Sequence, residues 1–559
     1  MGKRENFHIP EFGNNIYFFS PEDDVKEVQK TLDDIYAIQE ANHFGQERHA
    51  IYFLPGVYDK SLEANVGFFM HVAGLGISPE DVKFPSVQCR ANWLESGSNH
   101  NATCNFWRGV ENMMLSSETV FAVSQATYMR RMHIADTMHL HDQYGWASGG
   151  FLSDSKVDGI VDSGTQQQWL SRNCDWAGWN GQNWNIVFAG IEEGKAPAET
   201  WPEQTYTTVD MVENIQEKPF LVYDKEKGFG VYLPAIRTNC RGVSWDGKAV
   251  GSMGKVIPME EFYIARADVD TADSLNQALK KGKHLFFAPG IYHLDKELVV
   301  DQDNKIVLGT GLATLVPDKG NRCIRVTGAA TTIAGLLFDA GAQLSDTLLQ
   351  LEKTNKADYS YLSDLFFRVG GVADYEAKVH SCIVIHRDYV VGDNFWVWRA
   401  DHGEHVAWDK NTAENGIIVN GDYVTIYALM VEHFEEYQTV WNGEHGKTIM
   451  YQSELPYDVP SQEKWMSHDG QMNGYASYYV ASNVKTHEAW GLGIYSVFWK
   501  AAVDEHCVME VPETPEVKVH NICAVKIAGH PGLSHVINDE GESCIENNER
   551  HIITEWPIG

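Results

Sequence analysis

Residues 51–59 read IYFLPGVYD, and residues 285–293 read LFFAPGIYH. Both are short runs of aromatic and β-branched residues that lead into Pro-Gly and a further aromatic residue, a pattern typical of a β-strand and a turn. Each is followed by a second apolar run that contains Gly-x-Gly, HVAGLG at residues 71–76 and IVLGTGL at residues 306–312. One structural unit is therefore predicted to occur twice in the chain.

A helix is predicted just before each copy of this unit. Residues 23–44 and 270–283 are the two clearest segments in which apolar residues recur every three or four positions. The rest of each half consists of short apolar runs broken by Gly, Asn and Asp, such as GIIVNGDYVTIYALMVEHF at residues 416–434. A solenoid of stacked strand coils fits this pattern, because each coil buries its apolar face only against its neighbours. The helix would cap the open end of each solenoid.

The predicted fold class is therefore all-β, with two tandem right-handed parallel β-helices that each carry a capping helix. A pair of β-sandwiches or a propeller is the alternative, but the duplicated unit does not recur at the spacing of propeller blades. Residues 192–219 are polar, contain proline and lack periodicity, as connecting segments do. The predicted domains are residues 1–255, which include the connecting segment, and residues 256–559.

The composition limits the partners of the protein. The chain has 559 residues, of which 43% are apolar and 22% charged, so it is long enough for two large globular units. It contains 44 Lys and Arg against 77 Asp and Glu, and the net charge of −33 disfavours binding to nucleic acids or anionic membranes. No stretch approaches the roughly 18 apolar residues that a membrane-spanning helix needs.

The cysteines and the amino terminus favour a cytoplasmic location. The nine cysteines are an odd number without a CxxC pair, which is typical of reduced thiols rather than a disulfide framework. The first residues, MGKRENFHIPEFGNN, contain neither the apolar core nor the cleavage site of a secretory signal. Secretion, with a signal peptide removed from the chain, is the alternative.

Glu454 is the best candidate for a catalytic acid. It lies among Gln, Ser, Pro and Tyr after an apolar run, and a carboxyl group in such a half-buried aromatic setting tends to have a raised pKa. Glu432 precedes it by 22 residues (454 − 432), about one coil of a parallel β-helix. Adjacent coils would place their backbones about 4.8 Å apart, and paired carboxyl groups are the basic equipment of glycoside hydrolysis. A pair of ordinary surface glutamates is the alternative.

Several motifs resemble those of a known enzyme family. Residues 431–438 read VEHFEEYQ, residues 452–457 read QSELPY, and residues 398–402 read WRADH. These stretches resemble the signature of glycoside hydrolase family 55, which comprises exo- and endo-acting β-1,3-glucanases. In the amino-terminal half, SQAT at residues 124–127 and SGGF at residues 148–151 are similar to the first β-helix of that family. The family folds as two tandem right-handed β-helices in one chain, so the resemblance implies the same fold.

The resemblance also implies roles for four residues. Glu454 matches the general acid of the family, and Glu432 matches a second glutamate that helps to hold the attacking water. Gln125 and Ser148 match a glutamine and a serine near that water. Because the first β-helix supplies Gln125 and Ser148 and the second supplies the glutamates, the site is expected between the two units. The family inverts anomeric configuration, which requires room for a water opposite the acid.

The same motifs and the neighbouring aromatic residues supply candidates for substrate binding. Aromatic rings pack against sugar rings, although core packing is the alternative for each of them. The candidate substrate-binding residues are Trp146, Asp401, His402, His433, Trp441, Gln452 and Tyr457. The family commonly has a histidine where Phe434 stands and an aromatic residue where Asp458 stands, so subsite positions differ here.

No metal and no cofactor are predicted. His139 and His141 alternate on one predicted strand face near His133, but no Cys or carboxylate lies at a supporting spacing, and structural histidines are far more common than ligands. Residues 309–311 read Gly-Thr-Gly and lack the third glycine and the following helix of a dinucleotide-binding fingerprint.

The predicted function is an inverting glycoside hydrolase, similar to an exo-β-1,3-glucanase, that cleaves a β-linked glucan or a related neutral oligosaccharide. Its expected partner is therefore an oligosaccharide or polysaccharide. A polysaccharide lyase and a non-catalytic glycan-binding β-helix are the alternatives. A lyase needs a basic residue as its base, whereas the segments around Glu432 and Glu454 are rich in Glu and Gln.

Overall fold

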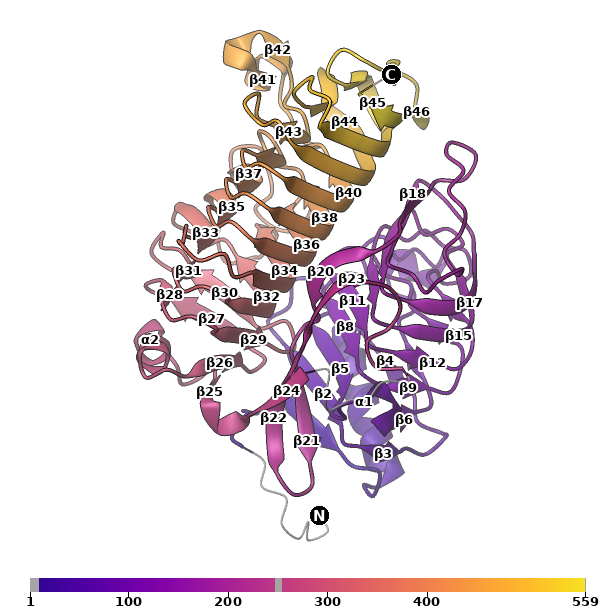
Figure 1. The fold of residues 1–559 in the computed structure, drawn as a ribbon, viewed down its shortest axis with the longest axis vertical. Helices are drawn as coiled ribbons and strands as arrows, with labels where there is room; N and C mark the ends of the chain where they lie inside the picture. Colours follow the sequence, from indigo (N-terminus) through magenta and orange to yellow (C-terminus); the bar gives the residue numbers. More distant parts are fainter. Residues whose placement is uncertain (1–9, 247–253, 558–559) are drawn as a thin grey trace.

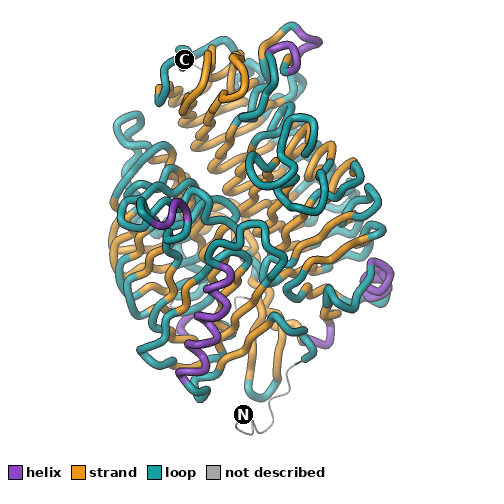
Figure 2. Tube along the Cα trace, turned by 180° about the vertical axis from the view of Figure 1, so that it is seen from behind, coloured by secondary structure: helices purple, strands orange, loops and turns teal. Residues whose placement is uncertain are grey.

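The computed structural model describes residues 10–246 and 254–557. In these ranges the chain forms two parallel β-helices that lie side by side (Figure 1). Figure 2 shows the same two stacks of strands from behind, with one longer helix and several short helical segments beside them. The predicted fold class, all-β with two tandem β-helices, is confirmed.

The first β-helix is built on two parallel sheets. The nine strands of the larger sheet are, in spatial order, β1 (Ile16–Phe19), β2 (His49–Phe53), β5 (Met70–Gly74), β8 (Arg108–Glu111), β11 (Thr127–Arg130), β14 (Phe151–Ser153), β16 (Gln168–Arg172), β18 (Asn185–Ala189) and β19 (Tyr206–Val209). The smaller sheet contains β10 (Thr119–Val120), β13 (Met138–His139), β15 (Lys156–Asp162), β12 (His133–Ile134), β9 (Met114–Leu115), β6 (Val82–Phe84) and β3 (Gly56–Val57), with β17 (Asp175–Asn180) beside β15. Apolar side chains of successive coils stack into one core between these sheets.

The second β-helix is a sheet of 20 strands that pair in the order of the sequence and between successive coils. Its long strands toward the first β-helix are β32 (Thr332–Asp339), β34 (Ser360–Val369), β36 (Val390–Arg399), β38 (Val424–Glu432), β40 (Gly446–Glu454) and the first parts of β44 (His487–Glu510) and β45 (Val517–Ile537). The other face contains β33 (Ser345–Leu351), β35 (Val379–Ile385), β37 (Ala413–Val419), β39 (Thr439–Trp441) and β43 (Tyr478–Val480). Among the described strands of this sheet, only β46 (Glu549–Trp556) runs antiparallel to its neighbour.

An antiparallel segment connects the two solenoids. It contains the pair β20 (Val212–Gln216) and β23 (Ile236–Cys240), and the sheet of β21 (Phe220–Asp224), β22 (Gly228–Pro234) and β24 (Gly254–Pro258). The second solenoid begins at β25 (Phe262–Ala265). The division after residue 255 falls within this connecting segment and stays a prediction about the domain boundary.

The duplicated sequence unit forms the same contacts in both halves. The hydroxyl of Tyr58 donates to the carbonyl oxygens of Phe19 and Leu54, at 2.7 and 2.9 Å. The hydroxyl of Tyr292, its counterpart, donates to the carbonyl oxygens of Ala265 and Ala288, both at 2.8 Å. Each tyrosine thus satisfies the carbonyl groups at the ends of two adjacent strands, which explains why a tyrosine follows the Pro-Gly turn in both copies.

The two predicted helices are present and pack on the cores. Helix α1 (Val25–Gln39) begins at Asp24, whose carboxylate accepts from the backbone N–H groups of Lys26 and Glu27. Helix α2 (Ala272–Lys280) begins at Thr271, which forms a capping box with Ser274. Each helix buries a stripe of apolar side chains against the strands of its own β-helix. Within the described ranges, no helix is long and apolar enough to cross a membrane.

Buried charges join the two solenoids, in addition to a cluster of aromatic residues. Arg172 of the first β-helix donates to both carboxylate oxygens of Glu217, each at 2.7 Å, and to both oxygens of Asp393 of the second, at 3.0 and 2.9 Å. Arg130 likewise bonds Asp364 and Asp393. Burial would raise the pKa of Glu217, but the charge of Arg172 lowers it to about 2. The arginine and carboxylate side chains therefore neutralise one another's charges within the interface.

Candidate active site

Glu432 and Glu454 are partners in the parallel ladder of β38 and β40. Side chains at partner positions of parallel strands point to the same face, so the two carboxyl groups are neighbours on one surface of the sheet. The spacing of 22 residues therefore corresponds to one coil, as the sequence predicts. Trp398 and Tyr495 continue the same column on the neighbouring strands β36 and β44.

Gln125 reaches this pair from the first β-helix. Its Nε2 donates to Oε1 of Glu432 at 2.8 Å, across 307 residues of sequence. Ala126, the next residue, has a φ of 58°, so the chain turns sharply before it enters β11. Gln125 and Glu432 are both buried. The structure thus brings these two predicted site residues into direct contact at the interface of the solenoids.

Ser148 lies one coil beyond Gln125 on the same side of the first β-helix. Its backbone N–H donates to Oγ of Ser124 at 2.9 Å, and Nε2 of Gln168 donates to its Oγ at 3.3 Å. A Cβ on the next residue, Gly149, would lie 3.5 Å from both Cγ of Gln125 and Sδ of Met430. These are ordinary contact distances, so the Ser148 segment lies against Gln125 and against strand β38, which ends in Glu432. Glycine is favoured at position 149 by its φ of 118°.

Three side chains surround the carboxyl group of Glu454. The hydroxyl of Tyr457 donates to its Oε2, and Nε2 of Gln452 donates to its Oε1 at 3.5 Å. Nε2 of His433 lies 3.8 Å from Oε2 of Glu454. The Glu454 side chain is 17% exposed, so it is the glutamate of the pair that a ligand can reach.

His433 and His402 share the carboxylate of Asp401. Nδ1 of His433 is paired with the carbonyl oxygen of Leu455 at 3.0 Å, which directs its Nε2 to within 3.9 Å of Asp401. Nδ1 of His402 lies 2.8 Å from the same carboxylate oxygen. Burial would raise the pKa of Asp401, but the charge of His433 and the hydrogen bond of His402 hold it well below its usual range.

The two glutamates have raised pKa values for physical reasons. Burial raises the pKa of Glu432 well above its ordinary value, and the neighbouring charge of Glu454 adds to this effect. Burial also raises the pKa of Glu454 and outweighs the lowering by His433 and Tyr457. Two adjacent buried carboxyl groups resist double ionisation, so the pair retains a proton closer to neutral pH than a free glutamate does.

The prediction that Trp441 binds the substrate is wrong, and Gln452 has a different role from the one predicted. Trp441 is 0% exposed and lies in the core of the second β-helix, because alternate residues of β39 face inward. It cannot pack on a sugar. Gln452 is also fully buried and contacts Glu454, so it supports the acid and does not meet the substrate directly. Trp146, in contrast, is 52% exposed.

The two tryptophans should therefore respond differently to substitution. Trp146→Ala is expected to raise KM roughly 2- to 12-fold, the effect of losing about 0.5–1.5 kcal/mol of aromatic packing, with an unchanged unfolding midpoint. Trp441→Ala should instead destabilise the protein by about 3–5 kcal/mol through a core cavity. Initial rates and urea denaturation of both variants measure this. A Trp146→Ala protein with unchanged KM on every glucan oligosaccharide contradicts a role in binding.

Some residues around the site were not anticipated from the sequence. Arg399 binds both carboxylate oxygens of Asp458, at 2.9 and 2.8 Å, and donates to the carbonyl oxygen of His433 at 3.1 Å. It thereby ties the Asp458 side chain, which follows Glu454, to the backbone of His433, which follows Glu432, and it was present in the WRADH stretch. Tyr495 packs its ring 4.9 Å from that of Trp184, but it lies 41 residues after Glu454 (495 − 454), so coil spacing could not indicate it.

The fold and this site define a class of protein. Parallel β-helices with paired, partly buried carboxyl groups of raised pKa form a carbohydrate-active enzyme of the glycoside hydrolase type. The model of the LAM55 pectate lyase-like domain matches residues 262–454. An exo-beta-1,3-glucanase from Streptomyces sp. (strain SirexAA-E / ActE) is 40% identical over 544 residues, which cover 95% of this chain and 87% of that protein.

Solved structures agree with this assignment. The structure of sacteLam55A from Streptomyces sp. SirexAA-E has a TM-score of 0.93 and 38% identity, and the match covers 98% of this chain and 99% of that one. A Glu-to-Ala variant of the same protein in complex with glucose has a TM-score of 0.92, with the same identity and coverage. The chain belongs to glycoside hydrolase family 55, the Lam55 family of β-1,3-glucanases.

Proposed function

We propose that this protein hydrolyses β-1,3-glucans from the chain end and releases glucose with inversion of the anomeric centre. The observation that carries the proposal is the stacked pair Glu432 and Glu454, held from the other β-helix by Gln125. The similarity to an exo-beta-1,3-glucanase and to a structure with bound glucose supports the choice of substrate.

In the proposed mechanism Glu454 is the general acid. It is the more exposed carboxyl group, and its raised pKa keeps a proton available for the departing glycosidic oxygen. Glu432 accepts a hydrogen bond from Gln125, which favours its ionised form and opposes the raising of its pKa by burial. When the proton shared by the pair is on Glu454, Glu432 is the carboxylate that orients and deprotonates a water. Ser148, one coil from Gln125, is the second ligand proposed for that water.

Burial of the pair supports attack by water and action at a chain end. Glu432 is only 3% exposed and one of its oxygens is occupied by Gln125, so it is poorly placed to attack a sugar itself. A water is small enough to act in its place, and a single displacement by water inverts the configuration. Because Glu454 is also largely covered, the end of a glucan fits the site better than the middle of a long strand.

The product and its first anomer test the proposal. Incubation with laminari-oligosaccharides is expected to yield glucose as the first product, and proton NMR at early times should show the α-anomer before mutarotation. A series of shorter oligosaccharides without early glucose would indicate cleavage inside the chain. Early β-glucose would indicate a double displacement. An unsaturated product that absorbs in the ultraviolet would identify a lyase instead.

Glu432→Gln tests the water-holding role separately. Loss of general base catalysis is expected to lower kcat by about 10²–10⁴-fold. The loss should be similar on an oligosaccharide and on a glucosyl fluoride, because both reactions need the activated water. Steady-state rates on the two substrates measure this ratio. A variant that regains activity on the fluoride alone shows that Glu432 assists the leaving group instead.

A further inference from the structure

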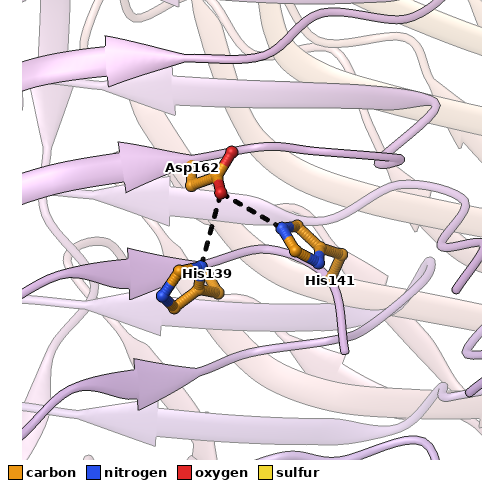
Figure 3. Close-up of side chains that lie close together, drawn as sticks. All are labelled: His139, His141 and Asp162. Atoms are coloured by element: carbon orange, nitrogen blue, oxygen red, sulfur yellow. Dashed lines mark hydrogen bonds and ion pairs between the residues drawn. The ribbon is translucent and has the colours of Figure 1, made fainter. Parts of the chain in front are cut away.

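A second cluster of potential ligands lies on the first β-helix, away from the glutamate pair. His139 and Asp162 are partners in the parallel ladder of β13 and β15, and His141 follows two residues after His139. The sequence alone favoured structural histidines here because no carboxylate stood at a supporting spacing. The fold supplies one from the next coil, and the three side chains converge on one point (Figure 3).

The distances from Asp162 to the two histidines are similar to those between ligands of a tetrahedral ion. Oδ2 of Asp162 lies 3.5 Å from Nδ1 of His139 and 3.3 Å from Nε2 of His141. In a tetrahedral zinc site with bonds of about 2.0–2.2 Å, neighbouring ligand atoms are about 3.3–3.5 Å apart. One ligand atom from each residue lies within 4.8 Å of the others.

Outer contacts hold each ligand in place. Oδ1 of Asp162 accepts from the backbone N–H of Gly164 at 3.2 Å and from Nδ2 of Asn180 at 3.1 Å, so Oδ2 is left for the two rings. Nε2 of His139 lies 3.4 Å from Oε1 of Glu118, the carboxylate–histidine arrangement that orients metal ligands. His133 is not part of the cluster, because it bonds other carboxylates.

The ring of His141 is closely packed by Tyr144 and Gly164. The ring of Tyr144 stacks on it with centroids 4.4 Å apart. A Cβ on Gly164 would lie 2.1 Å from Cδ2 of His141, so glycine is needed there if the ring is to keep its place. The side chain of His141 is 4% exposed and that of Asp162 11%. His139, at 25%, leaves one side of the cluster open to solvent.

We propose that His139, His141 and Asp162 bind one divalent transition-metal ion of the zinc type, with a fourth position open to water. Two imidazoles and one carboxylate suit zinc, cobalt and nickel, whereas calcium and magnesium prefer ligand sets made of oxygen atoms. Because His139 and Asp162 belong to adjacent coils, the ion would cross-link two coils of the first β-helix. Its role is structural, because none of its three ligands belongs to the site formed by Gln125, Ser148, Glu432 and Glu454.

The hydrogen bond between Tyr144 and His141 leads to a further prediction about metal binding. Its backbone N–H donates to Nδ1 of His141 at 3.0 Å, so in the metal-free protein the imidazole proton is on Nε2, toward Asp162. A metal ion on Nε2 displaces that proton, and Nδ1 takes a proton only if the Tyr144 N–H turns away. Binding is thus expected to alter the segment 142–148, which contains Trp146 and Ser148.

The test uses the full chain after treatment with a chelator and dialysis. Calorimetric titration with Zn²⁺ is expected to show one tight site in the parent protein, and Co²⁺ should give the absorption bands of a tetrahedral complex. His141→Gln and Asp162→Asn should each abolish the tight site. Glu118→Gln, which changes only the partner of His139, should weaken it by about 10- to 100-fold. Far-UV circular dichroism verifies that each variant is folded.

The matched control is His506→Gln. His506, His535 and Asp539 form a similar but more exposed cluster at the end of the second β-helix. If His506→Gln loses the tight zinc site while His141→Gln and Asp162→Asn keep it, the ion belongs to that cluster and the proposal is overturned. Absence of Zn²⁺ binding in the parent, or equal binding in His141→Gln and Asp162→Asn, overturns it as well. Hydrogen exchange of residues 142–148 should change on Zn²⁺ addition in the parent and not in Asp162→Asn.

Discussion

Glu454→Gln is expected to lower kcat on a β-1,3-glucan by about 10²–10⁴-fold, the usual contribution of general acid catalysis. The amide cannot donate a proton to the leaving oxygen as a carboxylic acid does, although it fills the same space beside Tyr457. A glucoside with a very good leaving group, such as a dinitrophenyl glucoside or glucosyl fluoride, needs little protonation. It should therefore lose much less activity, and parallel rates on both substrates measure the difference.

The pH profile provides the second measurement on this variant. Burial raises the pKa of Glu454, so the acid form persists to higher pH than in a free glutamate. Activity on the glucan should be present below the pKa of the Glu454 acid and lost as the pH rises through it. In Glu454→Gln this basic limb should disappear. A folded variant with near-full activity on the glucan contradicts the assignment of Glu454 as the acid.

Arg172→Met is expected to destabilise the protein by about 3–5 kcal/mol, as removal of one partner from a buried ion pair typically does. The change leaves the carboxylates of Glu217 and Asp393 without the guanidinium that bonds four of their oxygens. Urea denaturation monitored by circular dichroism measures the shift. Arg241→Met is the matched control, because Arg241 pairs with Asp210 near the surface, where such a pair contributes about 0–1 kcal/mol.

The acid side of the stability profile tests the same interaction. The pKa of Glu217 is about 2 in the folded protein against an ordinary value of 4.5. A carboxylate with a lowered pKa contributes stability that is fully present above its unfolded pKa and is lost as the pH falls toward the folded pKa. The difference between the parent and Arg172→Met should therefore narrow between pH 4.5 and about 2. A constant difference across this range would show that lost packing, and not charge, is responsible.

Contacts within one solenoid could be predicted from the sequence. The duplicated stretches at residues 51–59 and 285–293 predicted two copies of one architecture, and both copies place a tyrosine hydroxyl on two strand ends. The offset between Glu432 and Glu454 predicted neighbouring strands, and the ladder pairs these residues. In a parallel β-helix a residue meets the one that follows after one coil, so a distance along the chain becomes a distance in space wherever the coil length is regular.

Coil spacing fails as a guide where a coil has an irregular length, and it does not tell whether a side chain faces the core or the solvent. The coil after Glu454 is almost twice as long, so Tyr495 could not be located. The carboxylate of Asp162 was overlooked beside His139 because it belongs to the next coil and not to the same strand. Trp441 was assigned to the sugar because of its position near the motif, but the alternation of β39 turns it into the core.

The side-chain contacts between the two solenoids were decided by tertiary structure alone. Gln125 meets Glu432 and Arg172 meets Asp393 across more than two hundred residues of chain, with no period that relates one partner to the other. The resemblance to a family, and not the residues themselves, placed Gln125 and Ser148 near the glutamates. The sequence by itself determined the coils, because each coil packs on the next through local repeats of apolar residues. Only the docking of one finished β-helix on the other determined which polar side chains face each other, because that choice depends on the shapes and charges of two complete surfaces.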